Sequence, residues 1–327
     1  LDDARHRGTT FHEVPVKAIL NSPATTGMGF WSLNPYVGCE FGCTYCYARE
    51  THKWVMEKTA AGALGALPPW LAFEKQILVK TSAAAVLRRT LFPARMAGTS
   101  LVIGTATDPY QPAERRFQLT RSILDALRGW RGLSLGIITK SPLILRDLDL
   151  LVELNRRHEL SVNISIASVD GPLLRRIEAR SPAPHTRLRA LKGLVDAGIH
   201  AGLLVAPIIP GITDSKDALG AIMAAGKAAG ARYVVGSALR LGPAARTRFL
   251  PHLAEEFPEL AARYQQRFGH SESPGKDYID ALSRRIHALQ LAYGFPTDTD
   301  MSGRRRRQGY APRKPPIPDS AMQWNLL

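Results

Sequence analysis

The sequence is poor in cysteine: it has three in 327 residues, and all of them fall within residues 39–46. A disulfide framework needs an even number of cysteines spread along the chain, so this arrangement argues against one. A single short group of cysteines in a chain without disulfides is typical of metal binding.

Long apolar runs are also missing. No stretch approaches the ~18 consecutive apolar residues that a membrane-spanning helix requires. The opening segment, LDDARHRGTTFHEVP, has no apolar core of the signal-peptide type. Both features predict a cytoplasmic protein that does not enter the membrane.

Acidic residues are scarce relative to basic ones. The chain has 28 Asp and Glu against 43 Lys and Arg, a formal net charge of +15. Such an excess predicts an anionic partner, of which nucleic acid is the commonest, although many basic faces are merely solvated. The excess is greatest near the C-terminus, at Arg304, Arg305, Arg306 and Arg307, followed by Arg313 and Lys314.

Short apolar runs recur along the chain and are bounded by Gly, Pro, Asp or Ser, as strands are. They are residues 31–38, 101–105, 133–139, 162–167, 201–208 and 233–236. Segments with helical periodicity lie between them, among them 143–157, 187–197 and 218–229. This alternation predicts parallel βα units and an α/β fold: a partial (β/α)6 TIM-type barrel with extra C-terminal helices and a basic tail.

The same features divide the chain into four expected parts. Residues 1–29 form an N-terminal extension, and residues 30–242 form the partial barrel. Residues 243–293 form a C-terminal helical region. Residues 294–327 are rich in Pro, Arg and Gly, which predicts a flexible basic tail.

The cysteines stand in the segment NPYVGCEFGCTYCYAR with the spacing C-x3-C-x2-C. Thiolates are the usual protein ligands of iron–sulfur clusters, and Gly38 and Gly42 give the backbone freedom to wrap one. Three thiolates leave one iron of a four-iron cluster open, and an open metal position is where a small molecule binds and reacts. The alternatives are a structural zinc site completed by His12 or His52, or three free thiols. Zinc sites usually combine two separated ligand pairs, and the second pair is missing here.

With an aromatic residue, Tyr45, just before the third cysteine, this motif resembles that of the radical S-adenosylmethionine superfamily. The runs CTYCYA, TATDPY (105–110) and ITK (138–140) resemble the spore photoproduct lyase and DNA-repair-photolyase-like group within it. The resemblance covers about residues 30–240. It implies a [4Fe–4S] cluster on Cys39, Cys43 and Cys46, with S-adenosylmethionine cleaved to a 5′-deoxyadenosyl radical that takes hydrogen from a substrate.

The resemblance also implies roles for residues at the carboxyl ends of the predicted strands, where barrel enzymes place their chemistry. Tyr45 would lie near the adenine; Thr105, Thr107 and Asp108 would face the methionine amino group; Lys140 would pair with the methionine carboxylate; and Ser165 would approach the ribose. The alternatives are a turn residue for Asp108, an exposed loop lysine for Lys140 and a core hydroxyl for Ser165.

Spore photoproduct lyases of the best-known type return hydrogen from a cysteine that precedes the Thr/Ser-Asp motif. Thr105 occupies that position here, and the sequence has no fourth cysteine. Tyr45 and Tyr47 match the tyrosine pair that flanks the third cluster cysteine in that group, so the resemblance implies catalytic roles for both. Tyr47 would take part in hydrogen return, or it would stack on the cysteine loop. A base lesion other than the spore photoproduct is the expected substrate.

The function expected from these features is lyase-type repair of a nucleic-acid lesion or base, in DNA rather than RNA, with an electron donor such as flavodoxin or ferredoxin. Basic side chains near the barrel opening would track phosphates, unless they are solvent faces of outer helices. They are Arg115, Arg116, Arg175, Arg176, Arg180, His185, Arg187 and Arg189. The alternatives are radical modification of a peptide or small metabolite, and a non-enzymatic iron–sulfur protein that binds nucleic acid.

Overall fold

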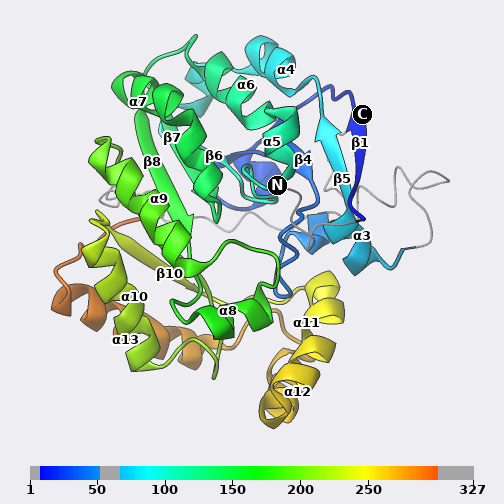
Figure 1. The fold of residues 1–327 in the computed structure, drawn as a ribbon, viewed down its shortest axis with the longest axis vertical. Coiled ribbons are helices and arrows are strands. Elements are labelled where there is room, and N and C mark those ends of the chain that lie inside the picture. The colour runs from blue at the N-terminus through cyan, green and yellow to red at the C-terminus, as the bar shows by residue number, and fades with distance from the viewer. Residues whose placement is uncertain (1–7, 52–66, 301–327) are drawn as a thin grey trace.

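The computed structural model describes residues 8–51 and 67–300, which form two sheets and a surrounding layer of helices (Figure 1). The larger sheet has seven strands. In spatial order they are β10 (Val234–Ala238), β9 (Ala201–Ile208), β8 (Glu159–Ser165), β7 (Ser134–Thr139), β6 (Ser100–Ile103), β3 (Trp31–Leu33) and β2 (Leu20–Asn21).

The strands from β3 to β10 in this sheet are parallel, and they follow one another in the order of the chain. Sequential parallel strands joined by helices are the arrangement of a TIM-type barrel. The predicted partial (β/α)6 barrel is therefore confirmed. The short strand β2 adds an antiparallel partner to β3 at the edge of the sheet.

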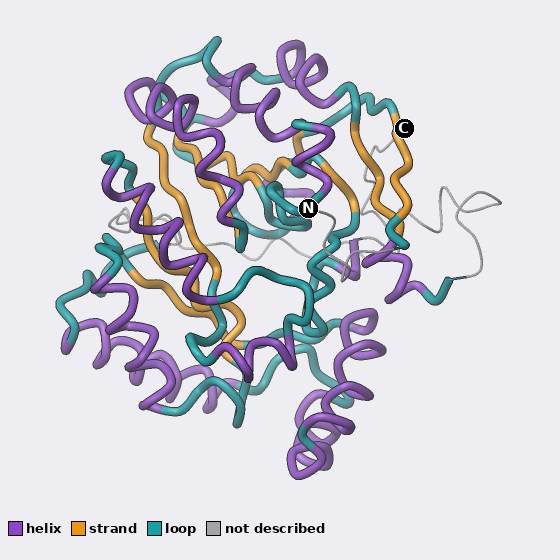
Figure 2. Tube along the Cα trace, viewed as in Figure 1, coloured by secondary structure: helices purple, strands orange, loops and turns teal. Residues whose placement is uncertain are grey.

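Helices cover the outer face of the sheet, and a further group follows its last strand (Figure 2). The helices before β10 are α1 (Pro23–Thr26), α3 (Pro69–Lys75), α4 (Ala83–Thr90), α5 (Ala113–Phe117), α6 (Leu119–Leu127), α7 (Leu148–Arg157), α8 (Gly171–Ile177), α9 (Pro184–Asp196) and α10 (Lys216–Ala228), with 3-10 turns at Pro93–Met96 and Pro142–Asp147. The expected C-terminal helices are α11 (Pro243–Glu256), α12 (Ala261–Phe268) and α13 (Lys276–Ala292), with a 3-10 turn at Pro258–Leu260. Among the described residues, no helix has the length and apolar character needed to cross a membrane.

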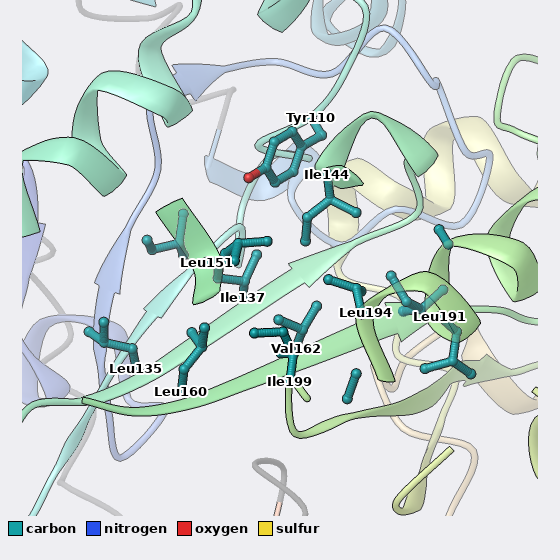
Figure 3. Close-up of a cluster of buried hydrophobic side chains, with 14 of the residues drawn as sticks. Tyr110, Leu135, Ile137, Ile144, Leu151, Leu160, Val162, Leu191, Leu194 and Ile199 are labelled. Atoms are coloured by element: carbon teal, nitrogen blue, oxygen red, sulfur yellow. The ribbon is translucent and has the colours of Figure 1, made fainter. Parts of the chain in front are cut away.

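The main core lies between the parallel strands and the outer helices (Figure 3). Ile137 of β7 and Val162 of β8 meet Leu151 of α7 and Leu194 of α9, and all four side chains are fully buried. Burying one such side chain contributes about 1.5–3 kcal/mol. This layer fixes the strands relative to one another, so that their carboxyl ends meet at one edge.

The smaller sheet was not predicted from the sequence. It consists of β1 (Thr10–Val14), β5 (Gln76–Lys80) and β4 (Tyr36–Val37), with β5 in the centre. Residues 31–38, expected as one strand, are divided between the two sheets, and Asn34 and Pro35 separate the parts. Proline has no N–H to donate to a ladder and restricts the residue before it, so the chain leaves the larger sheet here.

The segment 143–157, expected as one helix, also has two parts. Residues Pro142–Asp147 form a 3-10 turn, and the α-helix begins only at Leu148. The side chain of Ser141 caps the turn by accepting a hydrogen bond from the backbone N–H of Leu143, as the sequence Ser-Pro suggests.

Candidate active site

The cysteine loop begins one residue after β4, at the carboxyl edge of the larger sheet. Gly38 has a φ of +86°, and a Cβ there would lie 2.9 Å from the carbonyl oxygen of Phe73. The Gly38 carbonyl accepts hydrogen bonds from Thr107 Oγ1 at 2.6 Å and from Gln111 Nε2 at 3.2 Å. The backbone N–H of Cys39 donates to the Phe73 carbonyl at 2.9 Å. The entry to the loop therefore requires glycine and is held from two sides, by α3 and by the segment after β6.

The second glycine of the loop fits under an ion pair. Gly42 has a φ of +56°, and a Cβ there would overlap the guanidinium of Arg180 and lie 2.7 Å from Oε2 of Glu74. Arg180 forms an ion pair with Glu74, and its Nε donates to the carbonyl of Glu40 at 2.7 Å. No side chain is accommodated at position 42 without displacing this pair.

Arg49, just after the loop, stabilises the conformation of the loop through its side chain. Its side chain is 1% exposed and donates to the carbonyls of Cys43 at 2.9 Å and Trp70 at 2.6 Å. It also forms an ion pair with Glu74 at 2.6 Å. Its Nε is buried and has no hydrogen-bond partner among the described residues.

The three cysteines carry free thiols, buried at Cys39 and Cys43 and half-buried at Cys46. Burial raises the pKa of all three thiols, to about 12 for Cys43. The thiolate forms therefore need a nearby cation, which iron supplies. Three thiols on one loop, with the orphaned Nε–H of Arg49 behind them, fit an anionic iron–sulfur cluster.

The two histidines considered as zinc ligands do not lie on the cysteine loop. Among the described residues, no three His, Cys, Asp or Glu side chains converge as the ligands of one ion would. His12 lies in β1, which β5 separates from β4 and the cysteine loop. His52, the other zinc ligand considered, lies outside the described residues.

Asp108 joins the ends of two strands. One carboxylate oxygen accepts hydrogen bonds from the Thr139 hydroxyl at 2.7 Å and the Tyr110 N–H at 2.9 Å, and the other accepts from the Lys140 N–H at 2.7 Å. Asp108 is thus more than a turn residue before Pro109, because it fixes the backbone at Lys140.

Thr105 lies in a polar network at the end of β6. Its hydroxyl is 2.5 Å from the Ser32 hydroxyl and accepts a hydrogen bond from Asn34 Nδ2 at 3.2 Å. The hydroxyl of Tyr47 donates to the Thr105 carbonyl, while the Tyr47 side chain is 45% exposed. The structure therefore brings together the two positions that the sequence linked to hydrogen return.

Lys140 follows β7 and Ser165 ends β8, and their side chains meet. Lys140 Nζ donates to Ser165 Oγ at 3.3 Å and lies 5.9 Å from the centroid of the Tyr45 ring. Burial alone would lower the pKa of Lys140, but the charges of Cys43 and Glu178 outweigh it and raise the pKa. Lys140 is therefore a retained cation beside the cysteine loop rather than a loop lysine in open solvent.

Sequence reasoning missed a buried ion pair under this site. Glu178 and Arg187 are both fully buried and paired. The hydroxyl of Tyr45 donates to Glu178, and Arg187 Nη1 donates to the Ser165 carbonyl at 3.0 Å. Burial raises the pKa of Glu178, but the charges of Arg187 and Lys140 more than offset it and hold the pKa at about 2. Glu178 follows α8 in a loop, where no sequence pattern marks it.

The basic residues around this region have mostly structural roles. Arg180 and Arg187 are committed to Glu74 and Glu178. Arg175 donates to backbone carbonyls, and Arg176 pairs with Glu256 of α11. These four arginines, expected at a basic barrel opening, instead hold the loop between α8 and α9 against its neighbours.

Comparison with known proteins identifies the class. Residues 33–219 match the Radical SAM superfamily, and the chain belongs to that superfamily. Its cofactors are those of the superfamily, a [4Fe–4S] cluster and S-adenosylmethionine.

The relatives in sequence come from distant sources. The chain is 35% identical over 293 residues to an uncharacterised protein of Mycobacterium bovis, covering 89% of this chain and 83% of that protein. It is 31% identical over 188 residues to an uncharacterised protein of Methanocaldococcus jannaschii, covering 58% of this chain and 64% of that one.

Among solved structures, the fold is similar to that of spore photoproduct lyase. A variant of that enzyme with tyrosine replaced by phenylalanine aligns with a TM-score of 0.62 and 15% identity, covering 90% of this chain and 82% of the other. A variant with bound AdoMet and dinucleoside spore photoproduct aligns with a TM-score of 0.57 and 15% identity, covering 88% and 79%. At this identity the similarity establishes the fold alone.

Proposed function

We propose that this radical S-adenosylmethionine enzyme acts on a nucleic-acid base lesion. The supporting observation is that the similarity to spore photoproduct lyase extends over 90% of this chain, well beyond the region shared by the superfamily. The net charge of +15 agrees with a polyanionic substrate. A small protein such as flavodoxin or ferredoxin would supply the electron.

In this proposal Cys39, Cys43 and Cys46 hold the cluster. When bound, these cofactors would supply a 5′-deoxyadenosyl radical for abstraction of a hydrogen atom from a substrate carbon. The protein positions the reactants and excludes water.

The remaining predicted site residues would bind S-adenosylmethionine. Lys140 offers a positive charge to the methionine carboxylate, and Asp108 fixes the backbone from which Lys140 extends. Tyr45 is held by Glu178 and would flank the adenine. Ser165 would face the ribose, and Thr105 and Thr107 would line the amino end.

Tyr47 is the residue proposed for hydrogen return. Its hydroxyl donates to the Thr105 carbonyl while the residue as a whole is 45% exposed, and Thr105 is a poor hydrogen-atom donor because it has no thiol. In this proposal all three cysteines of the sequence hold the cluster, and none is left as a hydrogen donor. The substrate is therefore a lesion whose repair does not need a thiol donor.

The radical chemistry is tested with protein purified without oxygen, reconstituted with iron and sulfide, and reduced with dithionite. Wild type is expected to form 5′-deoxyadenosine from S-adenosylmethionine, and Cys43→Ala is expected to form none. Lys192→Ala, which alters an exposed ion pair with Asp196, serves as the control and retains activity. Absence of product from a fully loaded, reduced wild-type protein would contradict the proposal.

The substrate is tested by adding ultraviolet-irradiated or intact oligonucleotides to the same assay. Irradiated DNA is expected to stimulate 5′-deoxyadenosine formation and to bind with an affinity that falls steeply as salt rises. Equal turnover with and without DNA, together with salt-independent binding, would favour a peptide or metabolite substrate instead.

A further inference from the structure

One buried carboxylate beside the cysteine loop faces three arginines. Glu74 of α3 has a side chain 4% exposed and pairs with Arg49 at 2.6 Å, with Arg180, and with Arg248 of α11 at 3.4 Å. The arginines come from just after the cysteine loop, from the α8–α9 loop and from α11. Arg248 also lies 4.8 Å from the ring centroid of Trp70.

The charges in this group do not balance. Glu74 neutralises one of the three guanidinium groups. Two further charges of opposite sign act within this group, Lys75, also on α3, and Glu40, on the cysteine loop, and burial raises the pKa of Glu40 to about 7. Two positive charges therefore remain on the side of the loop that faces α3 and α11. Partly buried charge without a counter-charge is destabilising unless a partner is present.

Arg49 adds a second, independent observation. Its Nη1 and Nη2 have acceptors, but its Nε–H is buried without one among the described residues. An unsatisfied buried donor costs about 1–3 kcal/mol. The charge of Arg49 also acts on the Cys46 thiol, where it opposes the rise in pKa that burial causes.

We propose that Arg49, Arg180 and Arg248, organised by Glu74, are tuning residues that raise the reduction potential of the cluster. A four-iron cluster held by three thiolates is anionic and becomes more negative when it gains an electron. Net charge and hydrogen bonds to sulfur are the principal determinants of cluster potential. Unmatched positive charge therefore stabilises the reduced form, which is the form that reacts with S-adenosylmethionine.

This effect on the reduction potential does not depend on which substrate the enzyme uses. Its test is a redox titration of the reconstituted protein without S-adenosylmethionine, followed by the electron paramagnetic resonance signal of the reduced cluster. Arg248 is the best position to change, because its side chain is 26% exposed and lies outside the cysteine loop. Iron content and the thermal melting curve are recorded for every variant.

Removing the positive charge of Arg248 should lower the reduction potential of the cluster, and removing the negative charge of Glu74 should raise it. R248Q is expected to lower the reduced fraction at a fixed potential about tenfold, which corresponds to ~59 mV for one electron. E74Q is expected to raise the reduced fraction. R248K keeps the charge and should keep the wild-type potential. R176Q removes the arginine that pairs with Glu256, away from the cysteine loop, and should leave the reduction potential of the cluster unchanged.

Loosening of the loop cannot imitate this pattern, because it would move both R248Q and E74Q in the same direction. If E74Q fails to load iron, the comparison of R248Q with R248K still shows whether the positive charge at position 248 raises the reduction potential. Equal potentials for R248Q, R248K and wild type would overturn the proposal. A reconstituted wild type that retains no iron would show instead that the cysteines do not hold the cluster.

Discussion

The hydroxyl of Tyr45 donates a hydrogen bond to the carboxylate of Glu178, although the two residues are 133 positions apart in the sequence. Glu178 pairs in turn with Arg187, which holds the backbone of Ser165. One buried ion pair thus orients an aromatic residue of the cysteine loop and the end of β8. The pair is the structural support of the proposed cofactor pocket.

Breaking the Glu178–Arg187 ion pair should strongly destabilise the fold. Arg187→Met leaves Glu178 charged and buried without its partner, and the free energy of unfolding is expected to fall by about 3–5 kcal/mol. The control is Arg176→Met, whose ion pair with Glu256 is about 40% exposed and should be worth less than ~1 kcal/mol. Urea unfolding of the cluster-free protein measures both. Similar losses for the two variants would contradict the role given to the buried pair.

A comparison of Gly42→Ala with Gly27→Ala should distinguish the effect of backbone strain from that of a steric clash. Gly42 and Gly27 both have left-handed backbones, with φ of +56° and +65°, so alanine costs about 1–2 kcal/mol of strain at either position. Only at Gly42 does the new methyl group meet Arg180 and Glu74; at Gly27 nothing lies within 4 Å. Gly42→Ala is expected to lose more stability and most of its iron after reconstitution, whereas Gly27→Ala keeps its iron. Equal iron content in both would rule out the collision.

Lys140→Gln should weaken binding of S-adenosylmethionine. Losing the cation beside Ser165 and Tyr45 is expected to lower affinity about tenfold, since a hydrogen bond to a charged group is worth about 1.5–3 kcal/mol. Equilibrium binding to the reconstituted protein measures this, and the exposed Lys192→Gln is the control. An unchanged affinity would remove Lys140 from the pocket.

Tyr47→Phe tests hydrogen return separately from radical formation. Loss of the hydroxyl that donates to Thr105 should leave 5′-deoxyadenosine formation within about twofold of wild type but lower repaired product about tenfold or more. Both compounds are quantified in the same reaction by chromatography. A parallel fall of both would indicate that Tyr47 acts before the substrate radical forms.

Lys80 of β5 gives a pH-dependent prediction. Its side chain is 5% exposed, its Nζ donates to the Asn34 carbonyl at 2.9 Å, and burial lowers its pKa to about 8. The unfolded chain keeps an ordinary lysine pKa near ~10.4, so burial of the charge destabilises the fold fully below pH 8 and less as the pH rises toward ~10. Lys80→Met should be more stable than wild type by about 2–3 kcal/mol at pH 7, with a smaller gain at pH 10. Denaturant unfolding at both pH values measures the difference, and a variant less stable at pH 7 would show that the hydrogen bond to Asn34 dominates.

The parallel barrel could be predicted because its strands are buried on both faces and read as unbroken apolar runs. All six of those runs contain strands of the larger sheet. The smaller sheet could not be predicted: Thr10–Val14 alternates weakly, and Tyr36–Val37 is too short to read as a separate strand. Its pairing depends on contacts with β5, which follows the cysteines by some thirty positions.

Part of the site could be predicted for the same reason. Lys140 follows β7 directly, Ser165 ends β8, and Asp108 comes shortly after β6, so the fold alone brings them to one edge. Glu74, Glu178 and Arg187 belong to helices and a loop, and their meeting with the cysteine loop is set by tertiary packing. The spacing of the arginines in the sequence does not distinguish Arg180 and Arg187, which lie in the protein interior, from arginines that face solvent.

The contacts that shape the cysteine loop also have an order in time. The chain emerges from the ribosome with its N-terminus first, so Cys39, Cys43 and Cys46 appear early. Ile177, whose carbonyl accepts from the Thr44 N–H, and Arg180, which covers Gly42, appear more than 130 residues later. A nascent chain shorter than this contains all three cysteines but lacks the residues that complete the surroundings of the loop. The cluster proposed on these cysteines would therefore reach its native surroundings only after most of the barrel has been synthesised.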